Sequence, residues 1–227
     1  MKRESPKQCA YCRGYFGRRQ LTKDHVPPQG VFGKEWRKGQ VLPWVYCCNS
    51  CREGQSKGDE ALKVVVGMGI VRTEVSNSVR DDVLRSLARQ TWWKKGMIDS
   101  IEKGFSGGVD IEGIGGAQIM LAEDFVSELD GSISRISRGL IFQKNSQIDT
   151  SKFNFEVRQY NEDRSKELVE LVAQIVQKAK GPAHLKRVGD AFFAAWWLAG
   201  DPVNSGIMLQ NYFGGLNFII LFSEKNR

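Results

Sequence analysis

The chain has 227 residues, of which 41% are hydrophobic and 26% are charged, so its composition is that of a globular protein and excludes disordered and collagen-like classes. Its formal net charge is +7, and residues 1–60 hold twelve Lys and Arg against six Asp and Glu. This excess favours either a phosphate-binding surface or a solvated basic surface without a partner. No apolar run approaches the ~18 residues of a membrane helix, and no secretory signal is visible, so we expect a cytosolic protein that makes no membrane contact.

All five cysteines lie in the N-terminal quarter of the chain. An odd number of cysteines in a chain expected in the cytosol argues against a disulfide framework. Cys9 and Cys12 form one Cys-x2-Cys pair, and Cys48 and Cys51 form a second pair after 35 intervening residues. Each pair presents two sulfurs to one ion, so we predict a structural Zn²⁺ ion held by these four thiolates. Cys47 leaves open a second pair that is shifted by one residue.

The N-terminal elements are predicted from turn residues and apolar spacing. A short basic segment over residues 15–22 leads into the turn Asp24-His25-Val26-Pro27-Pro28, and a strand is expected over 42–46. A helix begins at about residue 56, with Ala61, Leu62, Val65 and Val66 on one face, and an amphipathic helix follows over 77–95. The glycine-rich stretch 104–116 is expected to form a linker or a pair of strands.

The C-terminal part alternates between helical and strand patterns. We predict helices over 122–140 and 165–180, a strand over 153–157, and an antiparallel meander over 191–198, 207–210 and 216–222 with a tight turn at Gly214-Gly215. Its core is expected to be separate from the zinc module and to bury Phe193, Trp197, Leu209 and Phe218. The predicted fold class is α+β, with a zinc module over residues 1–70 and an α+β domain over 71–227 for target recognition or assembly.

The order of these motifs resembles the HNH nuclease superfamily, which has a ββα-metal fold with a four-cysteine zinc staple. The resemblance is carried by Cys9-x2-Cys12, by Asp24-His25-Val26-Pro27-Pro28, and by Cys48-x2-Cys51 with Asp59-Glu60 behind it. Two further elements resemble bacterial HNH proteins of the Asp-His-Val-Pro-Pro type. These are Arg138-Gly139-Leu140 and Phe213-Gly214-Gly215-Leu216-Asn217-Phe218.

The resemblance implies a metal-dependent endonuclease that hydrolyses DNA phosphodiester bonds. Such a reaction needs a base and a cation, so we predict His25 as the general base and Asp24 as a ligand of Mg²⁺ or Mn²⁺. The family carries Asn as its second metal ligand at the position of Arg52. We therefore assign that role to Glu53, the next residue, and keep Asp59 as the alternative.

Basic residues near the cysteine pairs are expected to contact nucleic-acid phosphates; these are Arg18, Arg19, Lys34, Arg37 and Arg52. One alternative is a catalytically impaired zinc protein that binds DNA or RNA, which the Arg at position 52 favours. Another is an interaction module of a larger complex, and a homo-oligomer or a partner protein is compatible with the sequence. The resemblance suggests a cellular role in defence or mobile-element biology.

Overall fold

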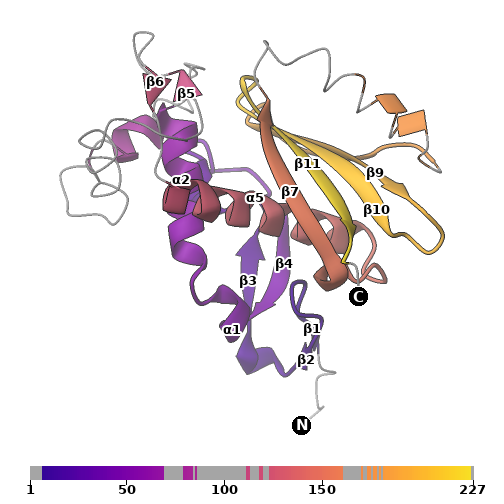
Figure 1. The fold of residues 1–227 in the computed structure, drawn as a ribbon. Helices are drawn as coiled ribbons and strands as arrows, with labels where there is room; N and C mark the ends of the chain where they lie inside the picture. The colour runs from indigo at the N-terminus through magenta and orange to yellow at the C-terminus, as the bar shows by residue number, and fades with distance from the viewer. Residues whose placement is uncertain are drawn as a thin grey trace.

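A computed structural model describes residues 7–68, 79–83, 85, 111–112, 118–119, 123–160, 170, 173–174, 176–177, 179 and 181–225. These residues form both helices and antiparallel strands, in agreement with the predicted α+β class (Figure 1). Within this described part, no helix is both long and apolar enough to cross a membrane.

The N-terminal part is a small hairpin, a larger hairpin and a helix. Strands β1 (Lys7–Gln8) and β2 (Tyr15–Phe16) pair around the first cysteine pair, and β3 (Leu21–His25) pairs antiparallel with β4 (Trp44–Cys48). A short helix α1 (Asn49–Arg52) and the longer α2 (Gln55–Met68) follow. Short 3₁₀ turns lie at Arg18–Gln20 and Gln29–Val31. The predicted apolar face of α2 is confirmed, because Ala61, Leu62, Val65 and Val66 are all buried.

Strand β4 begins two residues later than the sequence predicts. Pro43 precedes it and has no N–H group to donate to the ladder, although its carbonyl oxygen accepts a hydrogen bond from Val26 N at 2.9 Å. The pairing then continues to Cys48, which lies opposite Leu21 at the start of β3. The ladder therefore ends where the second cysteine pair begins.

The C-terminal part is one long helix and a five-stranded antiparallel sheet. Helix α5 (Glu123–Lys144) precedes a 3₁₀ turn at Thr150–Lys152 and strand β7 (Phe153–Tyr160). The remaining strands are β8 (His184–Val188), β9 (Phe192–Ala199), β10 (Ser205–Tyr212) and β11 (Leu216–Glu224), in the sheet order β7-β11-β10-β9-β8. The predicted meander is thus confirmed as β9–β11, and Gly214 has the positive φ of 78° expected in its tight turn.

Helix α5 lies between the N-terminal elements and the sheet (Figure 1). Phe125, Leu129, Ile133, Ile136 and Leu140 recur at helical spacing and are all buried. Its side toward the sheet is polar as well as apolar, since Gln210 of β10 donates a 2.8 Å hydrogen bond to the hydroxyl of Ser137. Both faces of α5 are therefore covered by other parts of the chain.

The prediction of a separate C-terminal core is wrong. One continuous cluster of buried residues runs from Cys9 and Val26 through α5 to Tyr212 and Phe218. A sheet packed on the same helix as the N-terminal hairpin shares that helix's buried side chains, so the two parts cannot close independent cores.

Three of the four side chains predicted for this core lie elsewhere. Phe218 is buried as predicted, but Phe193 is 38% exposed. Trp197 and Leu209 are half-buried and pack in a second cluster with Ile207 and Ile219. Strands β9–β11 carry large apolar residues at successive positions. The usual alternation of apolar and polar residues is therefore missing, and the sequence does not show which side chains face α5.

Several predictions lie outside the described residues, wholly or in large part. They are the module boundary at residue 70, most of the helix over 77–95 and most of the helix over 165–180. The glycine-rich stretch contributes β5 (Ile111–Glu112), which pairs with β6 (Gln118–Ile119), and this pairing agrees with one of its two predicted forms.

The close approach of α2 to α5 depends on Gly58. A Cβ atom at this position would lie 2.8 Å from the Glu128 carbonyl oxygen, and backbone cannot move as a side-chain end can. We predict that Gly58→Ala lowers the free energy of unfolding by about 1–3 kcal/mol, because it overpacks the helix contact. Gly131→Ala in α5 is the matched control, since a Cβ there meets nothing within 4 Å and raises helix propensity by about 1 kcal/mol. Urea unfolding measures both, and equal effects of the two substitutions would refute the packing argument.

Candidate functional site

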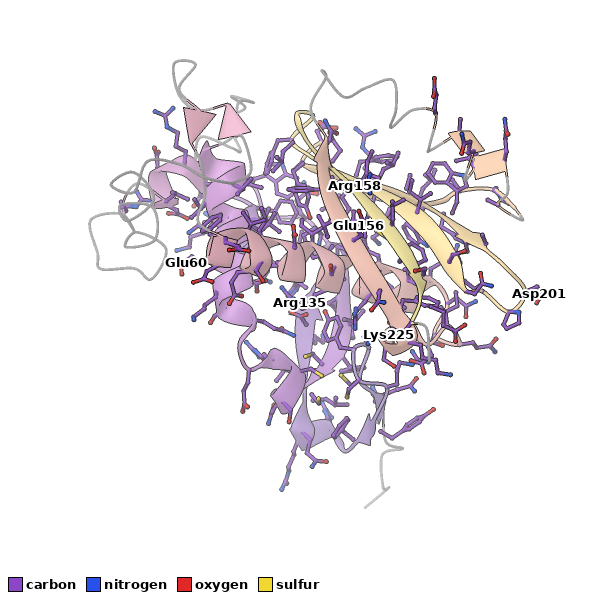
Figure 2. The ribbon with its side chains drawn as sticks, in the orientation of Figure 1. Glu60, Arg135, Glu156, Arg158, Asp201 and Lys225 are labelled. Atoms are coloured by element: carbon purple, nitrogen blue, oxygen red, sulfur yellow. The ribbon has the colours of Figure 1, made fainter. Side chains whose placement is uncertain are left out.

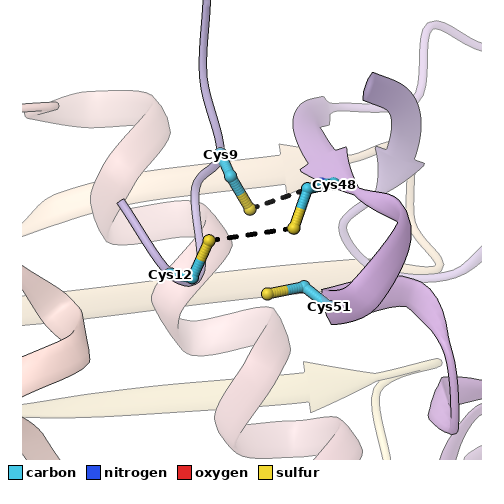
Figure 3. Close-up of side chains that lie close together, drawn as sticks. All are labelled: Cys9, Cys12, Cys48 and Cys51. Carbon is cyan, nitrogen blue, oxygen red and sulfur yellow. Dashed lines mark hydrogen bonds between the residues drawn. The ribbon is translucent and has the colours of Figure 1, made fainter. Parts of the chain in front are cut away.

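Four cysteines converge at one end of the β3–β4 hairpin. The Sγ atoms of Cys9, Cys12, Cys48 and Cys51 all lie within 4.8 Å of one another, and Figure 3 shows them pointing inward from two segments of the chain. Cys12 and Cys48 Sγ are 3.7 Å apart. The backbone N–H of Cys48 donates to Cys9 Sγ at 3.4 Å. Four sulfurs at this spacing are a donor set that could hold a zinc ion, as predicted from the sequence.

Cys47 is not a member of this group, so the second pair begins at Cys48. Its buried thiol donates to the carbonyl oxygen of Cys48 at 3.3 Å. A hydrogen bond from the side chain of Cys47 is the main influence that lowers the pKa of Cys9 to about 4, and burial opposes it. Burial raises the pKa of Cys12 and of Cys51, and these thiols must lose their protons when a metal ion binds.

We predict one zinc ion per chain in the purified protein and loss of that zinc in Cys12→Ser. Cys12 is the exposed member of the group, so its substitution removes a ligand with little loss of packing. Cys47→Ala, at a buried cysteine outside the group, is the control and keeps one zinc ion per chain. Elemental analysis measures the stoichiometry. Loss of zinc in Cys47→Ala as well as in Cys12→Ser would support the shifted pair, and zinc retained in Cys12→Ser would contradict the four-cysteine site.

Asp24 lies near the other end of the hairpin and is held by two donors. The hydroxyl of Tyr11 donates to its Oδ2 atom, and the guanidinium of Arg135 donates to the same oxygen at 2.8 Å. The side chains of Arg135 and Asp24 are only 9% and 15% exposed. Burial and the carboxylate of Asp24 raise the pKa of Tyr11 well above its usual value, so Tyr11 stays a neutral donor. Within the described residues, no hydrogen bond reaches Oδ1 of Asp24.

Arg135 also binds two side chains of α2. It donates to Gln55 Oε1 at 3.1 Å and forms an ion pair with Asp59, whose Oδ1 atom accepts a 3.3 Å hydrogen bond from Ser132. Burial raises the pKa of Asp59 to about 6. Figure 2 shows Arg135 between α5 and the hairpin. Arg135 comes 111 residues after Asp24, and sequence reasoning missed both it and Tyr11.

His25 is the last residue of β3 and is half-buried. Its Nε2 atom lies 3.1 Å from Nε2 of Gln29. Arg37 donates to Gln29 Oε1 at 3.3 Å, which turns the amide nitrogen of Gln29 toward the imidazole and makes His25 Nε2 the acceptor. Burial lowers the pKa of His25, with Lys23 and Arg37 acting in the same direction and Asp24 opposing them. A neutral imidazole is the form that can accept a proton.

Glu53 is not brought into contact with Asp24. It is exposed just after α1, and among the described residues the four cysteines are the one group of three or more metal-ligating side chains. The role of Glu53 as a second ligand therefore stays a prediction that no contact tests.

The predicted phosphate-binding residues surround the hairpin. Arg18 and Arg19 lie in the 3₁₀ turn before β3, at the end of the hairpin that carries the cysteines, and Lys34 is exposed in the loop before β4. Arg37 lies near His25, and the charge of exposed Arg52 acts on Asp59.

Comparisons with protein-family models, with curated proteins and with solved structures found no match to this chain. The interpretation of the site therefore depends on its own geometry and on the sequence motifs.

Proposed function

We propose that this protein is a metal-dependent endonuclease of the HNH type that hydrolyses phosphodiester bonds in DNA. The observation that carries the proposal is the position of Asp24 and His25 at the end of an antiparallel hairpin that continues into helices. The cysteine group lies at the opposite end of the same hairpin. This arrangement separates a stabilising metal centre from a carboxylate and an imidazole, as a small nuclease module requires.

His25 supplies the general base in this proposal. Its burial keeps the imidazole neutral near pH 7, so it can take a proton from the water that attacks the phosphorus atom. The Gln29 amide occupies Nε2, so a water molecule must displace this amide before it can transfer its proton to that atom. Asp24 would hold a Mg²⁺ or Mn²⁺ ion, which supplies positive charge to the phosphate as negative charge develops on it.

We predict that the wild-type protein nicks plasmid DNA with Mg²⁺ or Mn²⁺ and that His25→Ala lowers the rate at least about 100-fold, as expected for loss of a general base. DNA affinity should change little, because the base acts on the reaction rather than on binding. His184→Ala is the matched control. His184 is the other histidine of the chain and lies at the start of β8, with its ring centre 5.6 Å from that of Trp196, so its loss leaves cleavage unchanged.

Two outcomes would contradict the nuclease proposal. One is the absence of cleavage by the zinc-loaded wild type on duplex and single-stranded DNA with any divalent ion. The other is equal activity of wild type and His25→Ala, which would trace the cleavage to a contaminating nuclease.

A second candidate is a zinc protein that binds nucleic acid without cleaving it. The ion pair between Arg135 and Asp24 favours it, because a positive charge already lies on the carboxylate that should bind the metal ion. Arg52, where the resembling family has a metal-binding Asn, favours it as well. Both candidates bind nucleic acid, whereas an interaction module of a larger complex does not.

We predict that Arg37→Ala weakens binding to a DNA duplex and reduces the slope of log affinity against log salt by about one unit, as for one lost phosphate contact. Arg37 lies near His25, where a bound phosphate is expected. Arg158→Ala is the control, because Arg158 lies on β7 and pairs with Glu156. Fluorescence anisotropy at several salt concentrations measures both variants. Equal effects of the two substitutions would rule out a specific role of Arg37.

A further inference from the structure

Arg135 connects the C-terminal part to the candidate site through several polar contacts. Its side chain leaves α5, is 9% exposed, and reaches Asp24 of β3 together with Gln55 and Asp59 of α2. Three oxygen atoms from two elements thus converge on one guanidinium group.

The charges of this cluster do not cancel. Two acidic side chains, those of Asp24 and Asp59, lie against the single guanidinium group of Arg135. The cluster therefore holds one more acidic than basic side chain, and this small excess attracts a divalent ion only weakly. Inside a partly buried cluster, a charge a few ångströms away acts more strongly than it does in water.

One oxygen of Asp24 is nevertheless not engaged by Tyr11 or Arg135. Tyr11 and Arg135 both donate to Oδ2, and within the described part of the chain Oδ1 accepts no hydrogen bond. Arg135 therefore holds the carboxylate in one orientation while its charge opposes a second cation at the free oxygen.

We propose that Arg135 is a positioning residue that shifts the site from cation binding toward phosphate binding. It weakens the binding of a divalent ion to Asp24 and strengthens the binding of a nucleic-acid phosphate beside it. This inference rests on the proposed nuclease function. It implies that the metal ion binds to a useful extent only when the phosphate of the substrate adds negative charge to the site, as Mg²⁺ commonly binds through carboxylates together with substrate phosphates.

The test compares Arg135→Gln with Arg135→Lys in the full-length, zinc-loaded protein. Electron paramagnetic resonance measures Mn²⁺ binding without DNA, and fluorescence anisotropy measures binding to a short DNA duplex without added divalent ion. Arg135→Gln removes the charge, so Mn²⁺ should bind at least tenfold more tightly and DNA severalfold more weakly. Arg135→Lys keeps the charge but not the fork of N–H donors, so both affinities should lie closer to wild type than those of Arg135→Gln.

Opposite shifts are the result that a merely structural role would not produce, because a damaged site loses both affinities. The inference is overturned if Arg135→Gln weakens both ligands, if it changes neither, or if Arg135→Lys behaves as Arg135→Gln does. If wild type fails to cleave DNA, the nuclease proposal falls while the opposite shifts still report on the charge of Arg135.

A second variant keeps the inference falsifiable if Arg135→Gln fails to retain zinc. Asp59→Asn keeps the guanidinium and removes one negative charge of the same cluster. It should therefore weaken Mn²⁺ binding at least threefold and tighten DNA binding. Tighter Mn²⁺ binding in Asp59→Asn would overturn the inference.

Discussion

The ion pairs of Arg135 join the two halves of this protein at a largely buried cluster of charged side chains. Its guanidinium holds Asp24 on the hairpin and Asp59 on the following helix, while its own helix packs against the sheet. Removing one partner from such a buried pair commonly costs about 3–5 kcal/mol, because the remaining charge is left without compensation. The N-terminal motifs therefore depend on a helix that begins more than fifty residues after α2 ends. The same helix also supplies the buried apolar side chains through which one core runs in both halves.

The cysteine group and the proposed catalytic residues lie at opposite ends of the β3–β4 hairpin. Cys48 pairs with Leu21 at one end of the ladder, and Trp44 pairs with His25 at the other. Gln55 connects these ends, because its amide donates to the Cys51 carbonyl and accepts from Arg135. A metal ion on the four sulfurs would thus fix the start of α2, and through Gln55 and Arg135 it would fix the orientation of Asp24. A metal ion bound by the cysteines and the proposed active site would therefore be coupled through the side chains of Gln55 and Arg135, not through shared ligands.

Motifs whose residues lie close together in the sequence could be predicted. Contacts between segments that lie far apart in the sequence could not. Cysteine spacing identified all four members of the sulfur group, and apolar spacing identified α5 and the meander. Arg135 could not be assigned to Asp24, because nothing in a single sequence marks a pairing over 111 positions. Phe193 and Trp197 were placed on the wrong face, since β9 carries apolar residues on both of its faces. The role of second metal ligand is assigned to Glu53 because it is the acidic residue nearest to Cys51 in the sequence. Its side chain is exposed, and among the described residues no hydrogen bond or ion pair joins it to Asp24.

The central claim is that Asp24 binds a divalent ion beside a nucleic-acid phosphate, apart from the zinc centre. Anomalous diffraction from crystals of His25→Ala with a DNA duplex and Mn²⁺ tests it directly, because data at the zinc and manganese edges distinguish the two metals. The account predicts a zinc peak among the Sγ atoms of the four cysteines, about 2.3 Å from each, and a manganese peak beside Oδ1 of Asp24. A manganese peak away from Asp24, or none there when DNA is bound beside His25, would contradict the account.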